Sequence, residues 1–280
     1  MKKTGFIICL IGFIVLGSLQ TYQYVSSSKA ERRLAGIVEK VNAAETVTAS
    51  PTAAPKKTDA AKAAAPTETP TPTPTTDPLA ERGITIPEKN LNWEELKANE
   101  NQDIYSWIYI PGTNVDYPVL QHPTEPSYYL DHNIDGSEGY PGCIYTKNVN
   151  KKDWTDPNTV IYGHNMKDGT MFRDLHKFED KAFFDEHQYM FIYTPEGTKV
   201  YEIFAAYTFS NLDLMMCFNY TTPDMVQIYF DGIWTNRDMN SHFRDDVVLQ
   251  GDSSKIITMS TCIGGQPDKR YLVQAVLLNP

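Results

Sequence analysis

The chain has 280 residues, 4 cysteines and a formal net charge of −10 with neutral histidines. It has no stripe of Lys and Arg with interleaved aromatic residues, which argues against nucleic acid as a partner. The cysteines are too few and too far apart for the disulfide framework of a small extracellular domain.

The N-terminus has the composition of a membrane segment. After Lys2 and Lys3, an uncharged and largely apolar run extends to Val25. A run of about 20 apolar residues is long enough to cross a bilayer as a helix. A cleaved signal peptide is the alternative, but it needs a small-residue cleavage site, for which residues 26–28 are a poor candidate. We therefore expect residues 1–25 to be a transmembrane anchor in the cell membrane, with the N-terminus inside and the remainder extracellular.

Residues 26–90 are expected to form a juxtamembrane segment and a stalk. Apolar residues recur at helical spacing within Glu31–Lys40, which predicts a short helix close to the membrane. From Asn42 to Pro78 the chain consists largely of Ala, Thr and Pro, which cannot bury enough apolar surface to fold. Aromatic and β-branched residues are concentrated afterwards, so we expect one folded domain over residues 91–280.

Short runs of β-branched and aromatic residues, bounded by Gly, Pro, Asn or Asp, predict strands throughout this domain. There are eight: Trp107–Ile110, Val115–Leu120, Gly142–Tyr145, Thr159–Tyr162, Tyr189–Tyr193, Lys199–Phe209, Lys255–Met259 and Tyr271–Leu278. Many short strands separated by turn residues are typical of an all-β sandwich or barrel. We favour a barrel, because two of the late runs are almost continuously apolar and need cover on both faces.

Three helices are expected between the strands. Trp93–Ala98 follows Asn92, a good capping residue, and carries two glutamates in its first turn. Thr170–Phe178 has apolar residues on one face. Pro223–Thr235 begins with Thr222 as a cap and proline at the first helical position. A helix of this length between late strands is expected to form the wall of a groove.

The first segment with candidate chemistry contains Cys262 and Arg270. A strand ends at Cys262, a short turn with two glycines follows, and Arg270 opens the next strand. If the two strands form a hairpin, both side chains lie at the same rim. An adjacent cation lowers the pKa of a thiol and favours the reactive thiolate. Cys262 is therefore a candidate nucleophile, although a lone cysteine at a strand end is more often structural.

The second segment contains His164, which follows a strand and Gly163 and precedes a turn. A histidine just beyond a strand end is exposed at the rim, and an imidazole pKa of about 6.5 suits proton transfer. His164 is a candidate acid–base group because Cys262 and Arg270 are expected at corresponding positions on the rim. The other histidines have no second ligand at metal-type spacing, so no metal or other cofactor is predicted. These are His122, His132, His176, His187 and His242.

The two segments carry a family resemblance. Thr258–Cys262, which reads Thr-Met-Ser-Thr-Cys, followed by Arg270 resembles the Thr-Leu-x-Thr-Cys…Arg signature of sortases. Tyr162–Met166 resembles the histidine block of the class B group, and Asp116–Val119 and Tyr128–Leu130 also look like that class. The resemblance covers essentially the whole folded part. It implies a mainly β fold, a closed eight-stranded sortase-type barrel with an N-terminal helix and an inserted helix between late strands.

The resemblance also implies an activity, that of a cysteine transpeptidase of Gram-positive bacteria. Cys262 would attack a secreted protein at its C-terminal sorting signal, after Thr, and form a thioacyl enzyme. Arg270 and backbone N–H groups would stabilise the oxyanion, and His164 would protonate the leaving amine. An amine of a peptidoglycan precursor or cross-bridge, or of a pilin subunit, would then accept the protein. Supporting roles around the groove are expected for Tyr162, Asn165, Met166, Ser260, Thr261 and Ile263.

Two other functional classes stay open at this point. A cell-wall cysteine peptidase or amidase could use the same side chains but would pass the acyl group to water. A non-catalytic binding module on a stalk would carry an inert Cys262. A disulfide between Cys143 and Cys217 also stays open, although two half-buried thiols are the simpler interpretation.

Overall fold

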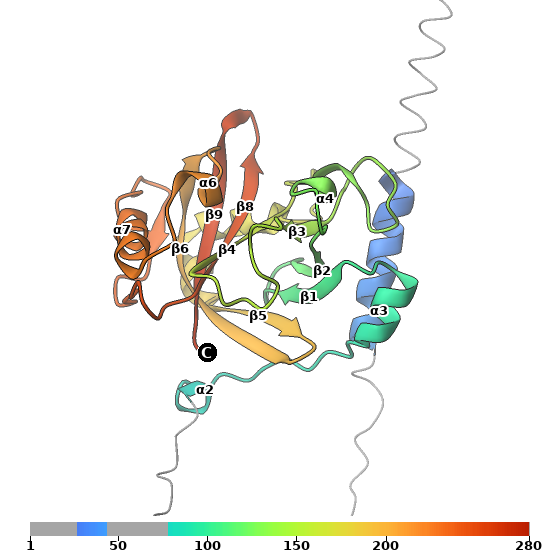
Figure 1. Cartoon of the computed structure of the whole chain (residues 1–280), viewed down its shortest axis with the longest axis horizontal. Coiled ribbons are helices and arrows are strands. Elements are labelled where there is room, and N and C mark those ends of the chain that lie inside the picture. Colours follow the sequence, from blue (N-terminus) through green and yellow to red (C-terminus); the bar gives the residue numbers. More distant parts are fainter. Residues whose placement is uncertain (1–26, 44–77, 280) are drawn as a thin grey trace, which may run out of the picture.

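The computed structural model describes residues 27–43 and 78–279 of the chain, and one sheet that closes on itself dominates this part (Figure 1). Its main strands are β1 (Ile104–Tyr109), β2 (Asp116–Leu120), β3 (Ile144–Thr146), β4 (Asn158–Tyr162), β5 (Tyr189–Thr194), β6 (Gly197–Ser210), β8 (Ile256–Ile263) and β9 (Gln266–Leu277). They follow the order β5-β1-β2-β3-β4-β8-β9-β6, and β6 pairs with β5 to close the barrel. A short strand, β7 (His242–Phe243), pairs with the edge of β6. The predicted eight-stranded barrel is confirmed.

Each predicted run overlaps one of the eight barrel strands, and the largest difference lies in the β8–β9 hairpin. The prediction ended the first strand at Met259 and began the second at Tyr271, whereas β8 runs to Ile263 and β9 starts at Gln266. Side chains in this extension are mostly exposed. No hydrophobic pattern therefore marks it, and backbone pairing alone prolongs the strands beyond the core.

The almost continuous apolar run of β6 is explained by two separate apolar clusters. Ile203 and Ala206 belong to the cluster that fills the barrel, whereas Phe204 and Tyr207 belong to a second cluster outside it. The helix α7 (Pro223–Ile233) covers this outer cluster with one face, which includes Phe230. Because successive side chains of a strand point to opposite faces, a strand covered on both sides is apolar throughout.

The remaining helices are short. They are α2 (Pro78–Glu81), α3 (Trp93–Asn99), α4 (Tyr128–Asp131), α5 (Lys181–Glu186) and α6 (Leu214–Cys217). The caps predicted for two helices are present, since Asn92 Oδ1 accepts from Glu95 N at 3.1 Å and Thr222 Oγ1 accepts from Met225 N at 3.4 Å. The helix predicted over Thr170–Phe178 is instead a 3₁₀ helix, η2 (Arg173–Glu179).

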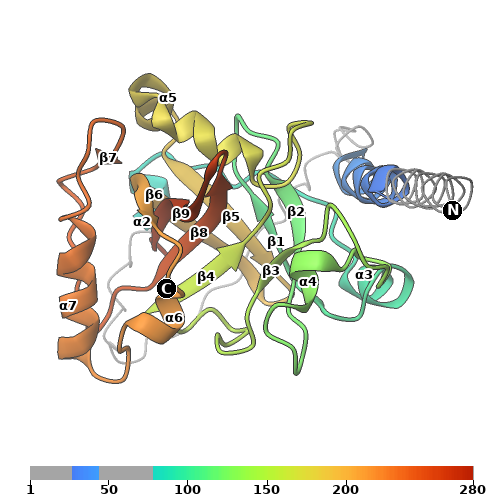
Figure 2. The same cartoon turned by 90° about the horizontal axis from the view of Figure 1, so that it is seen from above.

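A further helix over residues 27–42 lies against the barrel beside α3, as Figures 1 and 2 both show. Leu34, Ile37 and Val41 are buried in the main apolar cluster. At the C-terminal end of this helix, Asn42 Nδ2 donates to Asp116 Oδ2 of β2 at 2.8 Å. The helix expected over Glu31–Lys40 is thus longer than predicted, and its apolar face packs on the folded domain.

The predicted localisation requires correction. Within residues 27–43 and 78–279, none of the helices has both the length and the apolar character needed to cross a membrane. The helix over residues 27–42 buries only one face, and exposed charged residues such as Arg32 and Lys40 occupy the others. The predicted anchor, residues 1–25, lies outside the described residues. The prediction of a single-pass membrane protein is therefore wrong for the part of the chain that the structure describes.

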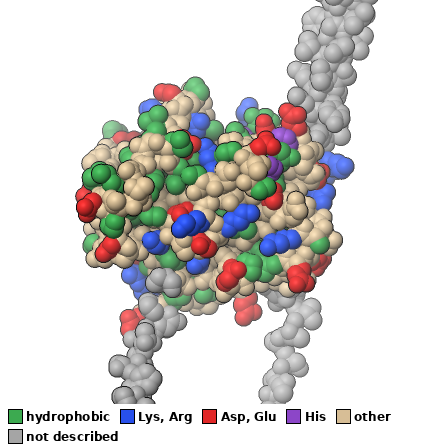
Figure 3. Space-filling view, viewed as in Figure 1, with side chains coloured by type: hydrophobic (Ala, Val, Ile, Leu, Met, Phe, Trp, Pro, Cys, Tyr) green, Lys and Arg blue, Asp and Glu red, His purple; other side chains and the backbone are tan. Residues whose placement is uncertain are grey.

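On the face of the molecule in Figure 3, basic and acidic side chains are interspersed over the barrel, and neither sign forms a continuous stripe.

Candidate active site

The β8–β9 hairpin brings Cys262 and Arg270 directly opposite each other. Their Cα atoms are partners in the antiparallel ladder, and a register shift follows between Cys262 and Ile263. The turn contains Gly265, whose φ of +75° lies in the left-handed region that glycine adopts without strain. Figure 1 shows this hairpin projecting beyond the barrel. This register places the two residues at one rim of the barrel.

His164 reaches the same rim through the pairing of β4 with β8. These strands are parallel, and Tyr162 is the partner of Ser260. Because parallel strands run in the same direction, residues that follow them emerge at the same edge. The connection continues past the end of β4, since Thr261 Oγ1 of β8 donates to the carbonyl oxygen of Gly163 at 2.9 Å. Cys262 follows Thr261 and His164 follows Gly163, so the two residues lie at the same edge of the barrel.

Gly163 is required by close packing. A Cβ atom at this position would lie 2.4 Å from Cδ1 of Ile144 and 2.7 Å from Cγ of Phe172. The loop after His164 is also closed, since Phe172 N–H donates to the His164 carbonyl at 2.9 Å. Just before it, the buried Met171 has a φ of +58°, which is rare for a residue other than glycine. The backbone that carries His164 is thus tightly held.

A groove of about 190 Å³ connects these residues. Cys262, His164 and Arg270 all line it, together with Ser127, Leu130, Tyr145, Lys147, Tyr162, Gly163, Asn211, Leu212, Asp213, Ser260 and Thr261. The Cys262 side chain is exposed and His164 is half-buried. The Cys262 thiol can therefore be reached from solvent.

The supporting residues predicted from the sequence lie in three different surroundings. Tyr162, Ser260 and Thr261 line the groove. Met166 and Ile263 instead pack against the apolar cluster of the barrel. The remaining one, Asn165, contacts the backbone of Cys262 from outside the groove.

His164 has a partner that the sequence did not suggest. Its Nε2 lies 2.7 Å from the carbonyl oxygen of Leu130, and its ring lies 5.0 Å from that of Tyr140. Because a carbonyl oxygen only accepts, Nε2 carries a hydrogen in this contact. In the neutral imidazole, Nδ1 is then the nitrogen that can accept a proton.

Arg270 is held by backbone groups. Its NH1 donates to the carbonyl oxygens of Pro267 at 3.0 Å and Lys269 at 2.7 Å. In the part of the chain that the structure describes, no carboxylate forms an ion pair with Arg270. Its positive charge is therefore free to interact with an anion in the groove.

The lining of the groove also includes a charged pair. Lys147 Nζ lies 2.6 Å from Asp213 Oδ2 and 5.0 Å from the centre of the Tyr162 ring. That ring stacks on Tyr145 at 5.4 Å. Burial raises the pKa of both tyrosine hydroxyls, so they stay neutral at physiological pH. One wall of the groove is formed by Asn211, Leu212 and Asp213. The helix α7 was expected to form such a wall, but it covers the outer face of the barrel instead.

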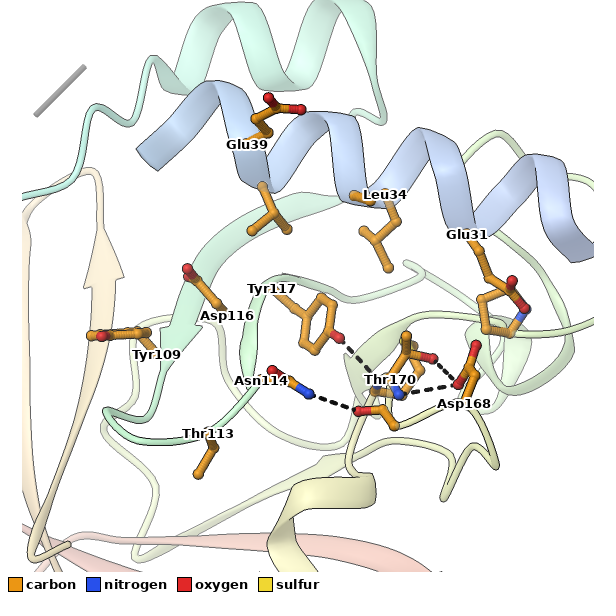
Figure 4. Close-up of a pocket in the computed structure, with 15 residues that line it drawn as sticks. Glu31, Leu34, Glu39, Tyr109, Thr113, Asn114, Asp116, Tyr117, Asp168 and Thr170 are labelled. Carbon is orange, nitrogen blue, oxygen red and sulfur yellow. Dashed lines mark hydrogen bonds between the residues drawn. The ribbon is translucent and has the colours of Figure 1, made fainter. Parts of the chain in front are cut away.

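A larger pocket of about 440 Å³ lies between the helix over residues 27–42 and the barrel (Figure 4). Leu34 and Tyr117 give it apolar walls, and Glu31 and Asp168 lie at its edge. Its lining includes none of the predicted catalytic or supporting residues. The chemistry of the lining, rather than its size, therefore identifies the smaller groove as the candidate active site.

The other two cysteines among the described residues, Cys143 and Cys217, lie outside the groove. Cys143, Cys217 and Cys262 are all free thiols, so the disulfide left open by the sequence does not form. Cys143 is buried, which raises the pKa of its thiol, and Cys217 is exposed. Among the described residues, no group of three or more His, Cys, Asp or Glu side chains is arranged to hold a metal ion.

A model of the sortase domain matches residues 108–278, more than half of the chain. Sortase B of Listeria monocytogenes is 36% identical over 164 residues, covering 58% of this chain and 63% of that protein. The chain thus spans slightly less than two thirds of that relative. Sortase B of Staphylococcus aureus is 27% identical over 180 residues, covering 64% of this chain and 71% of that protein.

Solved structures agree with these matches. Clostridium perfringens sortase B has a TM-score of 0.59 at 29% identity, covering 66% of this chain and 99% of that one. A Streptococcus pyogenes class B sortase involved in pilus biogenesis has a TM-score of 0.56 at 25% identity, covering 67% and 98%. The matched residues include the β8–β9 hairpin and the strand that leads to His164. The chain therefore belongs to the sortase family, and to its class B group.

Proposed function

We propose that the chain is a cysteine transpeptidase, which cleaves a C-terminal sorting signal of a secreted protein and transfers that protein to an amine. One observation carries the proposal: Cys262 is the cross-strand partner of Arg270 in a groove that His164 also lines. A thiol, a cation and an acid–base group in one open groove are the parts that acyl transfer through a thioester requires. The catalytic domain proposed here is residues 91–280.

In the first step, the Cys262 thiolate attacks the carbonyl carbon of the Thr that precedes the scissile bond. The Arg270 guanidinium, which has no carboxylate partner among the described residues, stabilises the developing oxyanion. The C–N bond then breaks, and imidazolium His164 gives a proton to the leaving amine. A thioester between the substrate and Cys262 remains.

In the second step, an amine attacks the thioester carbon and the Cys262 sulfur leaves. Neutral His164 accepts the proton of the attacking amine, through the nitrogen that does not face the Leu130 carbonyl. Water would give a free carboxylate instead. Because Cys262 is exposed, the acceptor can approach from solvent after the first product has left.

The substrate classes proposed are secreted proteins with a C-terminal sorting motif and, as acceptors, amines of a peptidoglycan precursor or cross-bridge or of a pilin subunit. Two related structures support this choice. A Staphylococcus aureus sortase B has been solved as a substrate complex, at 27% identity to this chain. The Streptococcus pyogenes relative is described as acting in pilus biogenesis.

Mass spectrometry of the full chain tests the proposal. The chain is incubated with Leu-Pro-x-Thr-Gly-like and Asn-Pro-x-Thr-x peptides, with and without an oligoglycine or diaminopimelate-type amine, and Cys262→Ala serves as the control. We expect an acyl adduct on Cys262 that moves to the added amine. Free carboxylate that is indifferent to the amine would favour a hydrolase, and the absence of any Cys262 adduct would overturn the enzyme proposal.

A further inference from the structure

The η2 helix presents three rows of side chains to three different surroundings. A 3₁₀ helix has about three residues per turn, so side chains three apart lie in line. Leu175 and Phe178 form a buried row. Asp174 and Lys177 form a second row, with an ion pair of 2.9 Å. The third row consists of Arg173, His176 and Glu179.

Two side chains reach the backbone carbonyl of Cys262. Asn165 Nδ2 lies 2.8 Å from this oxygen, and His176 Nε2 lies 3.0 Å from it. The contact falls at the point where the ladder between β8 and β9 changes register. Side chains of another element therefore hold the nucleophile's backbone directly before that irregularity.

Charged residues of the third row form hydrogen bonds with both side chains, through the atoms that do not face Cys262. Arg173 NH1 donates to Asn165 Oδ1 at 3.1 Å, which turns the amide nitrogen toward Cys262. Glu179 Oε1 lies 2.6 Å from His176 Nδ1. Because carboxylate and carbonyl oxygens only accept, both ring nitrogens carry a hydrogen in these two contacts: Nδ1 donates to Glu179, and Nε2 donates to the Cys262 carbonyl, on which Asn165 Nδ2 converges as a second donor.

His176 also contacts the second strand of the hairpin. Its ring stacks on Tyr271 at a centroid distance of 5.1 Å and an interplanar angle of 22°. Tyr271 follows Arg270 in the chain and is the cross-strand partner of Thr261. One imidazole therefore touches both strands that carry the proposed nucleophile and cation.

We propose that Asn165 and His176, oriented by Arg173 and Glu179, are positioning residues that hold the Cys262 carbonyl and so fix the thiol relative to His164. Asn165 follows His164 directly, so its bond to Cys262 ties the loop of the acid–base group to the strand of the nucleophile. The proposal rests on the transpeptidase function proposed above. Neither residue touches the reacting atoms.

Two substitutions of His176 separate positioning from simple packing. In His176→Gln, the amide nitrogen reaches the place of Nε2 and can donate to the Cys262 carbonyl. In His176→Asn, the shorter amide reaches only the place of Nδ1 and can contact Glu179. Both remove the ring that stacks on Tyr271, so a role in packing alone predicts the same effect for both.

The measurement is the rate of Cys262 alkylation by iodoacetamide in the full chain over a pH series, read by peptide mass spectrometry. Exposed Cys217 is an internal control, since it lies outside the groove. We expect His176→Asn to change the rate and its pH profile at Cys262 only, and His176→Gln to restore both. Acyl transfer should fall about tenfold in kcat in His176→Asn, with KM unchanged, for the loss of one positioning hydrogen bond.

Asn165→Asp provides a second test, because the carboxylate keeps the shape of the amide but cannot donate to a carbonyl. Asn148→Asp is the matched control, an exposed asparagine that contacts the Pro123 carbonyl outside the groove. We expect slower acyl transfer and an altered pH profile only in Asn165→Asp. Equal effects in the Gln and Asn variants of His176, or no effect in Asn165→Asp, would overturn the positioning proposal.

If the transpeptidase proposal fails, the alkylation experiment gives a result different from failure of the positioning proposal. Alkylation needs no sorting peptide, so it reports the placement of the Cys262 thiol even if the wild-type chain acylates no peptide. A wild-type chain without acyl adduct, but with the Gln and Asn variants still distinct in alkylation, would refute the transpeptidase and leave the positioning of the thiol supported.

Discussion

Arg270 is the residue on which the proposed oxyanion stabilisation depends. Replacing it with alanine removes the cation opposite Cys262, and loss of one such stabilising group costs about 10²–10³ in kcat. We expect a fall of this order for Arg270→Ala in single-turnover acylation of Cys262. Arg32→Ala, on the exposed face of the helix over residues 27–42, is the control. Acylation at the wild-type rate in Arg270→Ala would refute this role.

Gly163 sets a second requirement at the residue scale. An added methyl group would meet Ile144 and Phe172 far inside van der Waals contact. Overpacking of this kind costs about 1–3 kcal/mol, so Gly163→Ala should lower the free energy of unfolding by that amount. Urea denaturation checks the value. Gly264→Ala, where a Cβ meets nothing within 4 Å, should leave the midpoint nearly unchanged.

At the site, the sequence predicted individual residues but none of the contacts that hold them in place. Cys262, His164 and Arg270 were selected because strand ends, turns and charge mark them in the chain. His176 lies within the helix predicted over Thr170–Phe178, and a histidine without a second metal ligand at suitable spacing carries no signal by itself. The three-residue spacing of Arg173, His176 and Glu179 was available, but it is informative only for a 3₁₀ helix, and apolar spacing had predicted an α-helix there.

At the scale of elements, η2 is held in place through Asp174. Its Oδ2 accepts from Asn114 N at 2.8 Å and pairs with Lys177 Nζ at 2.9 Å, and the residue is buried. Asp174→Ala leaves a backbone N–H without its acceptor, so the free energy of unfolding should fall by about 1–3 kcal/mol. Urea denaturation measures this, with the exposed Asp185→Ala as control. A midpoint as high as that of the control would contradict the assigned role of Asp174.

The strands and helices were predicted correctly where burial imposes a regular spacing of apolar residues. They were missed where the side chains are exposed and no such spacing exists. Alternation and apolar runs identified all eight barrel strands, since each buries at least one face. The exposed end of the β8–β9 hairpin has no such pattern and was missed. Helix α7 was identified correctly, with its Thr222 cap, but its apolar face covers the outside of β6. A single sequence shows that a helix has an apolar face and leaves open which surface that face covers.

At the scale of the whole molecule, the helix over residues 27–42 belongs to the folded domain. Ile37 is 3% exposed and packs in the main apolar cluster. Truncating a buried Ile to Ala costs about 2–5 kcal/mol, and we expect Ile37→Ala to lower the free energy of unfolding by this order. Urea denaturation of the full chain is the measurement. If Ile37→Ala were no more destabilising than the exposed Lys40→Ala, the helix would not be docked in solution.

The parallel pairing of β4 with β8 also has a consequence for the order of folding. The bond from Thr261 to the Gly163 carbonyl joins residues 98 positions apart, and such long-range contacts form slowly because a long loop must close first. Arg270 reaches its place opposite Cys262 through the local β8–β9 hairpin, whereas the placement of His164 depends on the distant pairing of β4 with β8. The thiol, the cation and the acid–base group therefore come together only when β8 has paired with both β4 and β9, and acyl-transfer activity reports that both pairings are complete.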